Sequence, residues 1–285
     1  MQRVILIVLL LLAPGARADG LKIATWNLNW LTARATGDPV LPADVHTRSA
    51  DDIARLRRYA EILAADVVAL QEVDGPEIVA RLFPPQRYRI HITQDSVTQR
   101  VALAIRTGIA FSANPDLASL GIRSAAGGQL RSGADVTLDL GAGRRLRLLA
   151  VHLKTGCWGD PLPSTKPSCT TLGQQLGPLE AWIAARRDEG VPFLVLGDFN
   201  RRMDGADTFW AGLAHIAPLV RATAGASSPC WGGESFIDHI IAGGPARAWL
   251  APGTLRVLVY RETGEDWKDR LSDHCPVSVR LQPPD

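Results

Sequence analysis

Short apolar runs of strand length recur along this 285-residue chain, and no other feature limits its fold as strongly. Their lengths and their alternation are those of β-strands. The runs are Leu21–Trp26, Asp66–Leu70, Tyr88–Ile92, Val101–Ile105, Ala134–Leu140, Leu146–Leu153, Phe193–Leu196, Phe236–Ile241, Thr254–Val259 and Pro276–Leu281. We expect the third and fourth runs to pair. A Gly-Ala-Gly turn at positions 141–143 predicts a hairpin between the fifth and sixth.

Two segments have the spacing of amphipathic helices instead, Ser49–Ala64 and Leu172–Arg187. Ser49 and Asp52 are placed as a capping box at the start of the first segment. Strands dominate and helices are interspersed, so we expect a mixed α and β fold in which at least one face of each sheet is covered. The absence of repeats and long linkers in the sequence favours one domain over residues 19–285.

Residues 1–18 have the layout of a secretory signal peptide. Arg3 supplies the positive charge, Val4–Leu12 is an uninterrupted aliphatic run, and the sequence ARA ending at Ala18 fits a cleavage site before Asp19. The run is far shorter than the roughly 20 residues of a membrane-spanning helix. We expect the mature chain to be secreted or periplasmic. A buried N-terminal strand and an uncleaved anchor are the alternatives.

Composition and charge narrow the classes of function. The chain is 46% apolar and 21% charged, which excludes low-complexity disorder, collagen and a many-span membrane protein. Its formal charge is +2, and removing Arg3 and Arg17 with the signal peptide leaves 29 basic against 29 acidic residues. A neutral mature chain lacks the polybasic signature of a protein that holds nucleic acid by bulk attraction alone.

Four cysteines in an oxidising compartment suggest two disulfides, for which three pairings exist. Cys157 and Cys169 flank a segment rich in Pro, Ser and Gly, and closing this short loop would remove chain entropy. We therefore favour Cys157–Cys169, which leaves Cys230 with Cys275. Structural zinc is disfavoured because no CxxC spacing exists. Free buried thiols remain an alternative for the second pair.

Polar residues directly follow or interrupt the apolar runs. They are Asn27, Glu72, His152, Asp198, Asn200, Asp238, His239, Asp273 and His274. Each alone has an ordinary explanation, such as a turn former, a solvated strand end or a satisfied core histidine. Their joint occurrence predicts a shared pocket, because strand ends on one edge of a sheet converge.

The chemistry of this set fits hydrolysis of a phosphate ester. Carboxylate and amide oxygens suit a hard cation such as Mg²⁺, which binds one or two carboxylates together with substrate phosphate. Two histidines suit a base and an acid in an in-line displacement, and Asn and His donors suit charge stabilisation on pentavalent phosphorus. A zinc protease and a serine hydrolase are disfavoured, because the sequence has neither an HExxH pair nor a GxSxG elbow.

Six motifs carry a resemblance to a known family, in that family's order. They are TWNLNW (Thr25–Trp30), QEV (Gln71–Val73), VHLK (Val151–Lys154), GDFN (Gly197–Asn200), IDHI (Ile237–Ile240) and SDHCPV (Ser272–Val277). Together they resemble the endonuclease/exonuclease/phosphatase superfamily, typified by pancreatic deoxyribonuclease. The resemblance implies a four-layer α/β/β/α sandwich with two central mixed sheets, and a divalent-metal-dependent phosphoesterase.

By this resemblance, three residues belong to a metal site. Glu72 is similar to the family's direct ligand, Asn27 accompanies it, and Asp273 would lie beside the ion. The cofactor implied is Mg²⁺, with Mn²⁺ and Ca²⁺ as alternatives. The number of ions, one or two, stays open.

The resemblance also implies roles in catalysis. His274 is similar to the general base that activates water, and Asp238 to the residue that orients its ring. Asp198 and Asn200 are similar to the pair that positions the nucleophile and stabilises the transition state. His152 resembles the acid histidine of the deoxyribonuclease and neutral sphingomyelinase branches. The abasic-site repair branch has Asn there, so a repair role is disfavoured, as it also is by secretion.

The departures from the family pattern concern the substrate rather than the chemistry. Where the deoxyribonuclease branch has arginines that contact DNA, this chain has Asn29 and Asp74. The strand that in the family carries a Glu supporting the acid histidine offers Gln99 instead. The hydrolytic residues are therefore retained, while the residues that grip DNA are replaced.

Three residues near these motifs are candidate substrate contacts. Arg201, in the Arg201-Arg202 pair after GDFN, is placed to reach a phosphate, with a solvated basic turn as the alternative. Trp158, in the loop between the first two cysteines, either stacks on substrate or packs the loop. Lys154 either approaches a phosphate or caps its strand.

The function expected from all this is a secreted, Mg²⁺-dependent phosphodiesterase acting on nucleic acid, monomeric and without a stable protein partner. The first alternative is a phosphodiesterase or phosphatase for sphingomyelin or inositol phosphates. Such an enzyme should expose an apolar hairpin, for which Phe209-Trp210 is the candidate. The second alternative is a catalytically silent binding protein, which retention of the acid, base and metal residues argues against.

Overall fold

The structure, a computed structural model, describes residues 20–125 and 127–284. The expected signal peptide, residues 1–18, lies outside them. Six strands form the first sheet, in the order β13-β14-β1-β2-β4-β3. Their bounds are β13 (Arg256–Val257), β14 (Val277–Leu281), β1 (Leu21–Leu31), β2 (Val67–Val73), β4 (Arg100–Arg106) and β3 (Tyr88–Ile92). β1 and β2 are parallel and the other neighbours are antiparallel, so the sheet is mixed.

A second six-stranded sheet has the order β5-β6-β7-β8-β12-β9 and is mixed in the same way, with β7 and β8 as its parallel pair. Its strands are β5 (Ala110–Ala113), β6 (Ala134–Asp139), β7 (Arg145–His152), β8 (Phe193–Asp198), β12 (Asp238–Gly243) and β9 (Leu219–Arg221). A short ribbon of β10 (Ser227–Ser228) and β11 (Glu234–Ser235) lies apart from both sheets.

Side-chain alternation along the strands sorts the apolar residues into layers. Along β1, Ile23 packs between the two sheets, whereas Ala24 and Trp26 face the helices on the outside. β8 does the same, with Leu194 toward the other sheet and Phe193 toward its own helices. Because each strand side has an apolar partner, both faces of each sheet are covered.

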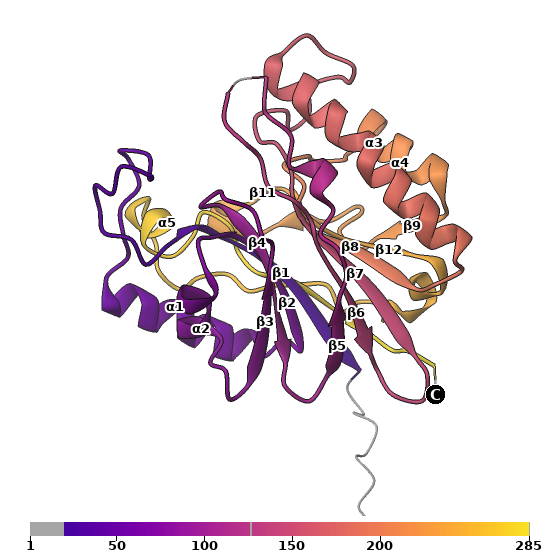
Figure 1. Ribbon diagram of the computed structural model, residues 1–285, viewed down its shortest axis with the longest axis horizontal. Coiled ribbons are helices and arrows are strands. Elements are labelled where there is room, and N and C mark those ends of the chain that lie inside the picture. Colours follow the sequence, from indigo (N-terminus) through magenta and orange to yellow (C-terminus); the bar gives the residue numbers. More distant parts are fainter. Residues whose placement is uncertain (1–19, 126, 285) are drawn as a thin grey trace, which may run out of the picture.

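The helices form the two outer layers (Figure 1). α1 (Ala50–Leu63) and α2 (Pro76–Leu82) cover the first sheet, and α3 (Pro167–Asp188) and α4 (Thr208–Ile216) cover the second. Shorter turns of helix are η1 (Ala118–Leu120), η2 (Cys230–Gly232), η3 (Gly244–Trp249) and α5 (Asp266–Arg270). The predicted four-layer α/β/β/α arrangement with two mixed sheets is therefore confirmed.

Local predictions from the sequence are mostly confirmed. Both expected strand pairs form, β3 with β4 and β6 with β7. α1 has the capping box: Ser49 Oγ accepts a hydrogen bond from the Asp52 backbone N–H at 3.1 Å, and the Asp52 carboxylate accepts one from the Ser49 backbone N–H at 3.2 Å. This exchange satisfies two backbone donors that the first turn would leave free.

Three local predictions differ from the structure. The run Thr254–Val259 yields only the two-residue strand β13, and α3 begins at Pro167, ahead of the predicted start. Phe209 and Trp210, proposed as part of an exposed hairpin, lie in α4, and Phe209 is fully buried in the layer beneath it. The apolar spacing of this segment serves helix packing, so it supplies no membrane-contacting hairpin.

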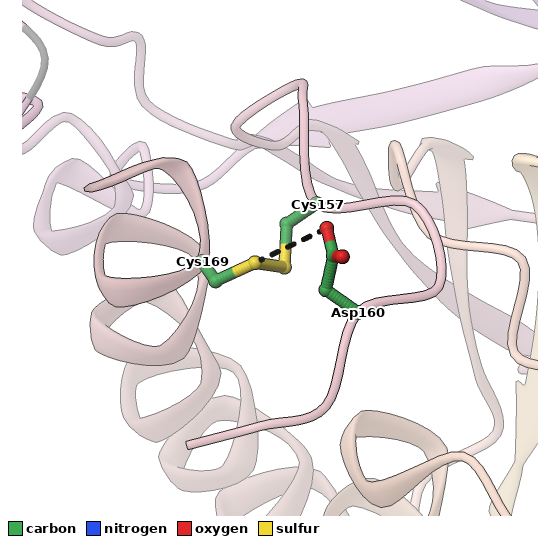
Figure 2. A group of neighbouring side chains, drawn as sticks. All are labelled: Cys157, Asp160 and Cys169. Atoms are coloured by element: carbon green, nitrogen blue, oxygen red, sulfur yellow. Dashed lines mark hydrogen bonds between the residues drawn. A yellow bond between two sulfur atoms is a disulfide. The ribbon is translucent and has the colours of Figure 1, made fainter. Parts of the chain in front are cut away.

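Both favoured disulfides are present, Cys157–Cys169 and Cys230–Cys275, and none of the four cysteines is free. Figure 2 shows the first bridge, with the Asp160 carboxylate 3.7 Å from the Cys169 sulfur. The two sulfurs are bonded to each other, so this group is not a zinc site. Two disulfides fit an oxidising compartment. No helix within residues 20–125 and 127–284 is long and apolar enough to cross a membrane.

Candidate active site

The polar residues predicted at strand ends come together where the two sheets meet. In the second sheet, Asp198 is the register partner of both His152, on the parallel strand β7, and Asp238, on the antiparallel strand β12. The first sheet joins them through Asn27, whose Nδ2 donates to Asp198 Oδ2 at 3.1 Å and to Glu72 Oε1 at 3.1 Å. Residues from five strands thus share one site.

Glu72 is held in an irregular part of β2. The register of β2 against β4 shifts at this residue, and its φ of 61° lies in the left-handed region. Such a conformation is costly for a residue with a Cβ and persists only where the surroundings fix it. Its Oε2 accepts from the Trp30 backbone N–H at 3.1 Å and from Gln99 Nε2 at 2.5 Å. The carboxylate is therefore oriented, with four acceptor positions only partly used.

Asp198 and Asn200 form a buried pair after β8. Asn200 donates to the Asp198 carboxylate twice, from its backbone N–H at 2.7 Å and from its Nδ2 at 3.0 Å. Asn200 has a φ of 51°, a left-handed turn that Asn tolerates better than most residues. Burial raises the pKa of the Asp198 carboxyl to about 7, against the opposing charge of His274.

His274 and Asp238 form a dyad. His274 Nδ1 lies 2.7 Å from Asp238 Oδ2, and its Nε2 lies 3.9 Å from Asp198 Oδ2. Burial alone would lower the pKa of His274, but the charges of Asp238 and Asp198 and the hydrogen bond to Asp238 outweigh it. The pKa is raised well above its usual value. Ser272 and Tyr260 fix the backbone of the loop: the His274 N–H donates to Ser272 Oγ at 3.0 Å, and the Tyr260 hydroxyl donates to the His274 carbonyl at 2.8 Å.

His152 is buried beside the same carboxylates. Its Nε2 lies 3.5 Å from Glu72 Oε1 and 3.5 Å from Asp198 Oδ2. Burial, followed by the positive charges of Arg131, His274 and Lys154, lowers its pKa well below the usual value, so the imidazole is neutral.

The other nitrogen of this ring, Nδ1, has no hydrogen-bond partner in the part of the chain that the structure describes. Gln99, expected in place of the Glu that supports this histidine, instead donates to Glu72. Within the described residues, Gln99 therefore gives the His152 ring none of the support that the family's Glu supplies. Nε2 is the nitrogen that faces the carboxylates, and a proton on it is the favourable tautomer.

A cavity of about 320 Å³ lies over these residues. Its lining includes Glu72, His152, Asp198, Asn200, His274, the exposed Asp273 and the half-buried Lys154. Trp158 lies outside this cavity and lines the groove next to it. The structure thus gathers most of the expected residues at one place. The exceptions are Trp158, in the adjacent groove, Arg201, and His239, whose two ring nitrogens face Thr223 and the Arg201 carbonyl in the interior rather than the pocket predicted for it.

Arg201 corrects the expectation of a substrate contact. Its side chain is only 2% exposed, and its NH2 lies 2.6 Å from Asp207 Oδ2. NH1 donates to the carbonyls of Cys157 at 2.8 Å and Asp160 at 2.7 Å. A guanidinium held in this way anchors the loop after β7, and its burial keeps it from reaching a substrate phosphate. Its neighbour Arg202 is the exposed member of the pair.

Arg131 is a site residue that the sequence did not indicate. It lines the cavity beside His152 and Lys154, yet its side chain is buried. Its Nε has no hydrogen-bond partner among the residues described, and NH2 reaches only the Leu153 carbonyl, at 3.5 Å. Burial lowers its pKa, against the charges of Glu72 and Asp198. Its sole sequence signal is an isolated basic residue shortly before β6, which is too common to single out.

The donor set fits a hard divalent cation. Ligand atoms of Asp198, Asp238 and His274 lie within 4.8 Å of one another, and Asp238 Oδ1 is buried without a partner in the described chain. However, His274 Nδ1 is already engaged by Asp238, which marks these two as a proton-handling pair. Glu72 keeps unused acceptor positions at the same cavity, so its carboxylate is the better anchor for an oxygen-seeking ion.

Comparisons with known proteins concern the family and the fold. A family model described as the Endonuclease/Exonuclease/phosphatase family matches residues 24–274. No curated protein matches the chain.

Among solved structures, truncated TDP2 of Caenorhabditis elegans has a TM-score of 0.59 at 16% identity, covering 92% of this chain and 98% of that one. The human Nocturnin catalytic domain has a TM-score of 0.58 at 16% identity, with 93% and 94% covered. The 3′ phosphatase NExo from Neisseria has a TM-score of 0.56 at 16% identity, with 92% and 100% covered. At such identities the likeness shows the fold alone.

Proposed function

This chain belongs to the endonuclease/exonuclease/phosphatase family, and we propose that it is a divalent-metal-dependent phosphodiesterase whose substrate is nucleic acid. One observation carries the proposal: an imidazole and carboxylate dyad, a second buried carboxylate and a partly unused Glu72 carboxylate surround one cavity. A base, an anchor for a cation and donors for an oxyanion are the groups that hydrolysis of a phosphodiester needs.

His274 is the general base in this proposal. Asp238 accepts a hydrogen bond from Nδ1, so the other ring nitrogen, Nε2, carries the lone pair that takes a proton from water. The carboxylate also stabilises the imidazolium that results. The backbone bonds of Ser272 and Tyr260 keep the ring from swinging away as the charge forms.

Asp198 and Asn200 position the attacking water and face the reacting phosphorus. Asp198 Oδ2 lies 3.9 Å from His274 Nε2, so a water held by this carboxylate is within reach of the base. The two bonds from Asn200 and the bond from Asn27 fix the direction in which that carboxylate points. A catalytic group that is already oriented needs no reorganisation during the reaction.

Glu72, with Asn27 and Asp273, would hold the cation, and Mg²⁺ is the ion we expect, with Mn²⁺ and Ca²⁺ as alternatives. When bound, the ion supplies Lewis-acid stabilisation of negative charge on phosphoryl oxygens. Asn27 and the Trp30 N–H hold the Glu72 carboxylate in one orientation. The exposed Asp273 lines the same cavity.

Three further donors that line the cavity suit the remaining phosphoryl oxygens. Arg131 has a buried guanidinium with an unused Nε, and Lys154 is half-buried in the lining of the same cavity. His152, kept neutral by burial, donates a hydrogen bond from Nε2 and does not begin the reaction as an imidazolium. We therefore propose that His152 stabilises a developing oxyanion in addition to any later proton transfer.

The scattered distribution of exposed apolar residues favours nucleic acid over phospholipid as the substrate. The exposed large apolar residues described are Val40, Ile62, Trp158, Val220 and Val259, which come from separate segments. The lipid alternative needs a contiguous apolar hairpin, and its candidate lies in α4. The Neisseria 3′ phosphatase structure is bound to a product DNA hairpin, which supports the same substrate class for this chain.

We further propose that the chain works as a secreted or periplasmic monomer, after cleavage between Ala18 and Asp19. The two disulfides support an oxidising location.

One substrate panel tests the function. The purified protein is assayed with Mg²⁺ and with EDTA on single-stranded DNA, plasmid DNA, RNA, sphingomyelin, inositol phosphates and bis(4-nitrophenyl) phosphate. We expect nucleic-acid hydrolysis that EDTA abolishes and that His274→Ala and Asp198→Ala lower by orders of magnitude in folded protein. Turnover of lipid or inositol substrates alone would overturn the nucleic-acid assignment, and unchanged activity in EDTA would overturn the metal.

A further inference from the structure

A second groove continues from the catalytic cavity and has a different lining. Its volume is about 490 Å³, and it shares Asn200, Asp273, His274 and Thr155 with the first cavity. Its outer part is lined by Trp158 and other residues that the chemistry proposed above does not use. The second lining is therefore continuous with the catalytic residues and available to a substrate longer than the first cavity.

Trp158 is exposed, yet the backbone that carries it is firmly held. Its side chain is 45% exposed. The preceding residue is bonded to Cys169, and the Trp158 carbonyl accepts from the Arg202 N–H at 2.9 Å. The buried Arg201 adds bonds to the carbonyls on either side of this turn, at Cys157 and Asp160. A rigid, solvent-facing indole loses little entropy when a flat ring stacks on it.

A second tryptophan, Trp231, lines the same groove from the other disulfide. It follows Cys230, has a φ of 47°, and donates from Nε1 to the Ser272 carbonyl at 3.1 Å. Its ring lies 5.4 Å from that of Tyr260. Each disulfide thus fixes one aromatic wall of the groove.

Cations accompany the aromatic walls. Arg202 and Lys268 both line the groove, and the Lys268 ammonium lies 5.9 Å from the Trp231 ring. Aromatic surfaces beside guanidinium and ammonium groups match a nucleotide, which has a flat base and an anionic phosphate. A lipid chain would instead need a mainly apolar groove.

The two positions that correspond to DNA-contacting arginines in the deoxyribonuclease branch, Asn29 and Asp74, form hydrogen bonds within the protein. Asp74 accepts from Arg34 Nε at 2.8 Å and from Thr32 Oγ1 at 2.7 Å. The Asn29 side chain donates to the Lys268 carbonyl at 3.2 Å. Neither position supplies a cation to a DNA backbone. In the groove, the Lys268 ammonium is paired with Glu265 at 2.9 Å, which leaves Arg202 as the cation placed to contact a phosphate there.

We infer that this groove is a subsite for one unpaired nucleotide next to the scissile phosphate, with Trp158 stacking on its base and Arg202 contacting its phosphate. The inference rests on the proposed function and deepens it, because it selects single strands over duplex. A base inside a duplex is already stacked on its neighbours and cannot also lie on Trp158. Single-stranded ends and loops are therefore the preferred substrates.

A two-way comparison of protein and substrate tests the stacking. The substrate is a short single-stranded oligonucleotide in which one linkage is a phosphodiester and the others are methylphosphonates. In one version an abasic sugar replaces the base on one side of that linkage, and in a second version the base on the other side. The proteins are the wild type, Trp158→Ala, Trp158→Phe and the control Ile62→Ala, an exposed apolar residue on α1.

We expect Trp158→Ala to lower kcat/KM on the intact oligonucleotide about 10-fold to 100-fold, and Trp158→Phe to restore most of it. Removing the base that stacks on Trp158 should lower kcat/KM of the wild type and of Ile62→Ala by a similar factor. It should lower kcat/KM of Trp158→Ala almost no further, because the ring on which this base stacks is already absent. The wild type should also cleave the single strand faster than the same sequence in a duplex.

If each abasic substrate lowers kcat/KM of Trp158→Ala as much as that of the wild type, whichever side of the linkage lacks its base, the subsite is overturned. The proposed function is then left intact. A wild type that prefers the duplex would overturn the subsite as well. A wild-type protein that hydrolyses no nucleic acid with any divalent cation would instead overturn the proposed function, and the subsite with it.

Discussion

Asp238 Oδ2 lies 2.7 Å from Nδ1 of His274, although the two residues are 36 positions apart in the chain. The carboxylate begins β12, and the imidazole lies in the loop just before β14, in the other sheet. The meeting of the two sheets at this edge creates the pair. Neither sheet alone would place a base next to its orienting carboxylate.

This pair predicts a pH effect. His274 must be neutral to accept a proton, and its raised pKa means that kcat/KM should rise as the pH increases through that value. Asp238→Asn removes a negative charge that favours the imidazolium, so the pKa should fall and the acid limb should move to lower pH. The rate on the plateau should fall about 100-fold or more, because the amide does not stabilise the imidazolium.

The pH–rate profile of the two proteins measures both effects. Glu61→Gln, which removes an exposed carboxylate on α1, serves as the control and should leave the profile in place. An acid limb at the same pH in Asp238→Asn and wild type would show that Asp238 does not set the pKa of His274.

Adjacent arginines should behave in opposite ways. Arg201→Met removes the cation from a buried ion pair with Asp207 and should lower the free energy of unfolding by about 3–5 kcal/mol. Arg202→Met should leave stability within about 0.5 kcal/mol, because this residue is exposed. It should instead raise KM for nucleic acid. Urea denaturation of both variants measures the change in stability, and steady-state kinetics measures the change in KM. An Arg201→Met protein that is as stable as the wild type but has a raised KM would show that Arg201 does contact the substrate.

The contrast also shows what the sequence could and could not predict. Glu72, Asp198 and His274 each follow or precede a short apolar run, so the convergence of strand ends was enough to place them in one pocket. Arg201 also follows such a run, yet it points away. The deciding partners, Asp207 and the carbonyls of the Cys157 loop, come from segments whose relative position depends on packing of the whole outer layer.

Arg131 is the opposite case. No motif surrounds it, and its position at the cavity depends on the course of the chain between η1 and β6, where regular structure is sparse. The strands and the capped helix α1 were predictable, because period and capping are local properties. Short strands such as β9 and the helix α4 cannot be predicted in this way, since their existence depends on the layer they cover.

The metal site makes a binding prediction. Glu72→Gln keeps the shape of the side chain and its contact with the Trp30 N–H, but removes the negative charge that an oxygen-seeking cation needs. We expect Mg²⁺ or Mn²⁺ affinity to fall at least ten-fold while the fold is kept. Isothermal titration of the metal-free protein measures this directly. Gln99→Met removes only the neighbouring amide donor and should weaken binding far less.

The two disulfides should differ in their contribution to stability. They close loops with sequence separations of 12 and 45 residues. In the chain-entropy account, a bridge stabilises more when its loop is longer, by about 3 kcal/mol and about 4 kcal/mol respectively. Replacing Cys230 and Cys275 by Ser should therefore lower the free energy of unfolding more than the same change at Cys157 and Cys169. Chemical denaturation compares them, and the reverse order would reject the entropic account here.

A buried histidine outside the catalytic dyad should make folding sensitive to acid. His239 lies at the core of β12; its Nε2 donates to the Arg201 carbonyl at 2.8 Å, and Thr223 Oγ1 lies 2.5 Å from its Nδ1. Burial lowers its pKa to about 4, from an ordinary value of 6.5. The neutral ring is therefore the form that the folded protein accepts.

Stability should fall at low pH, because the unfolded chain binds the His239 proton more tightly than the folded protein does. At a pH well above 6.5 the ring is neutral in both states, and its full contribution to stability is present. As the pH falls below 6.5, the unfolded chain takes up the proton first, and stability is lost until the pH reaches about 4. Between pH 7.5 and 4.5 this one group should account for about 3 kcal/mol of the loss. Urea denaturation at the two pH values should thus show a much smaller loss in His239→Asn than in wild type. His215→Asn, at an exposed position on α4, should lose as much as the wild type, and an equal loss in all three proteins would show that His239 is not the group responsible.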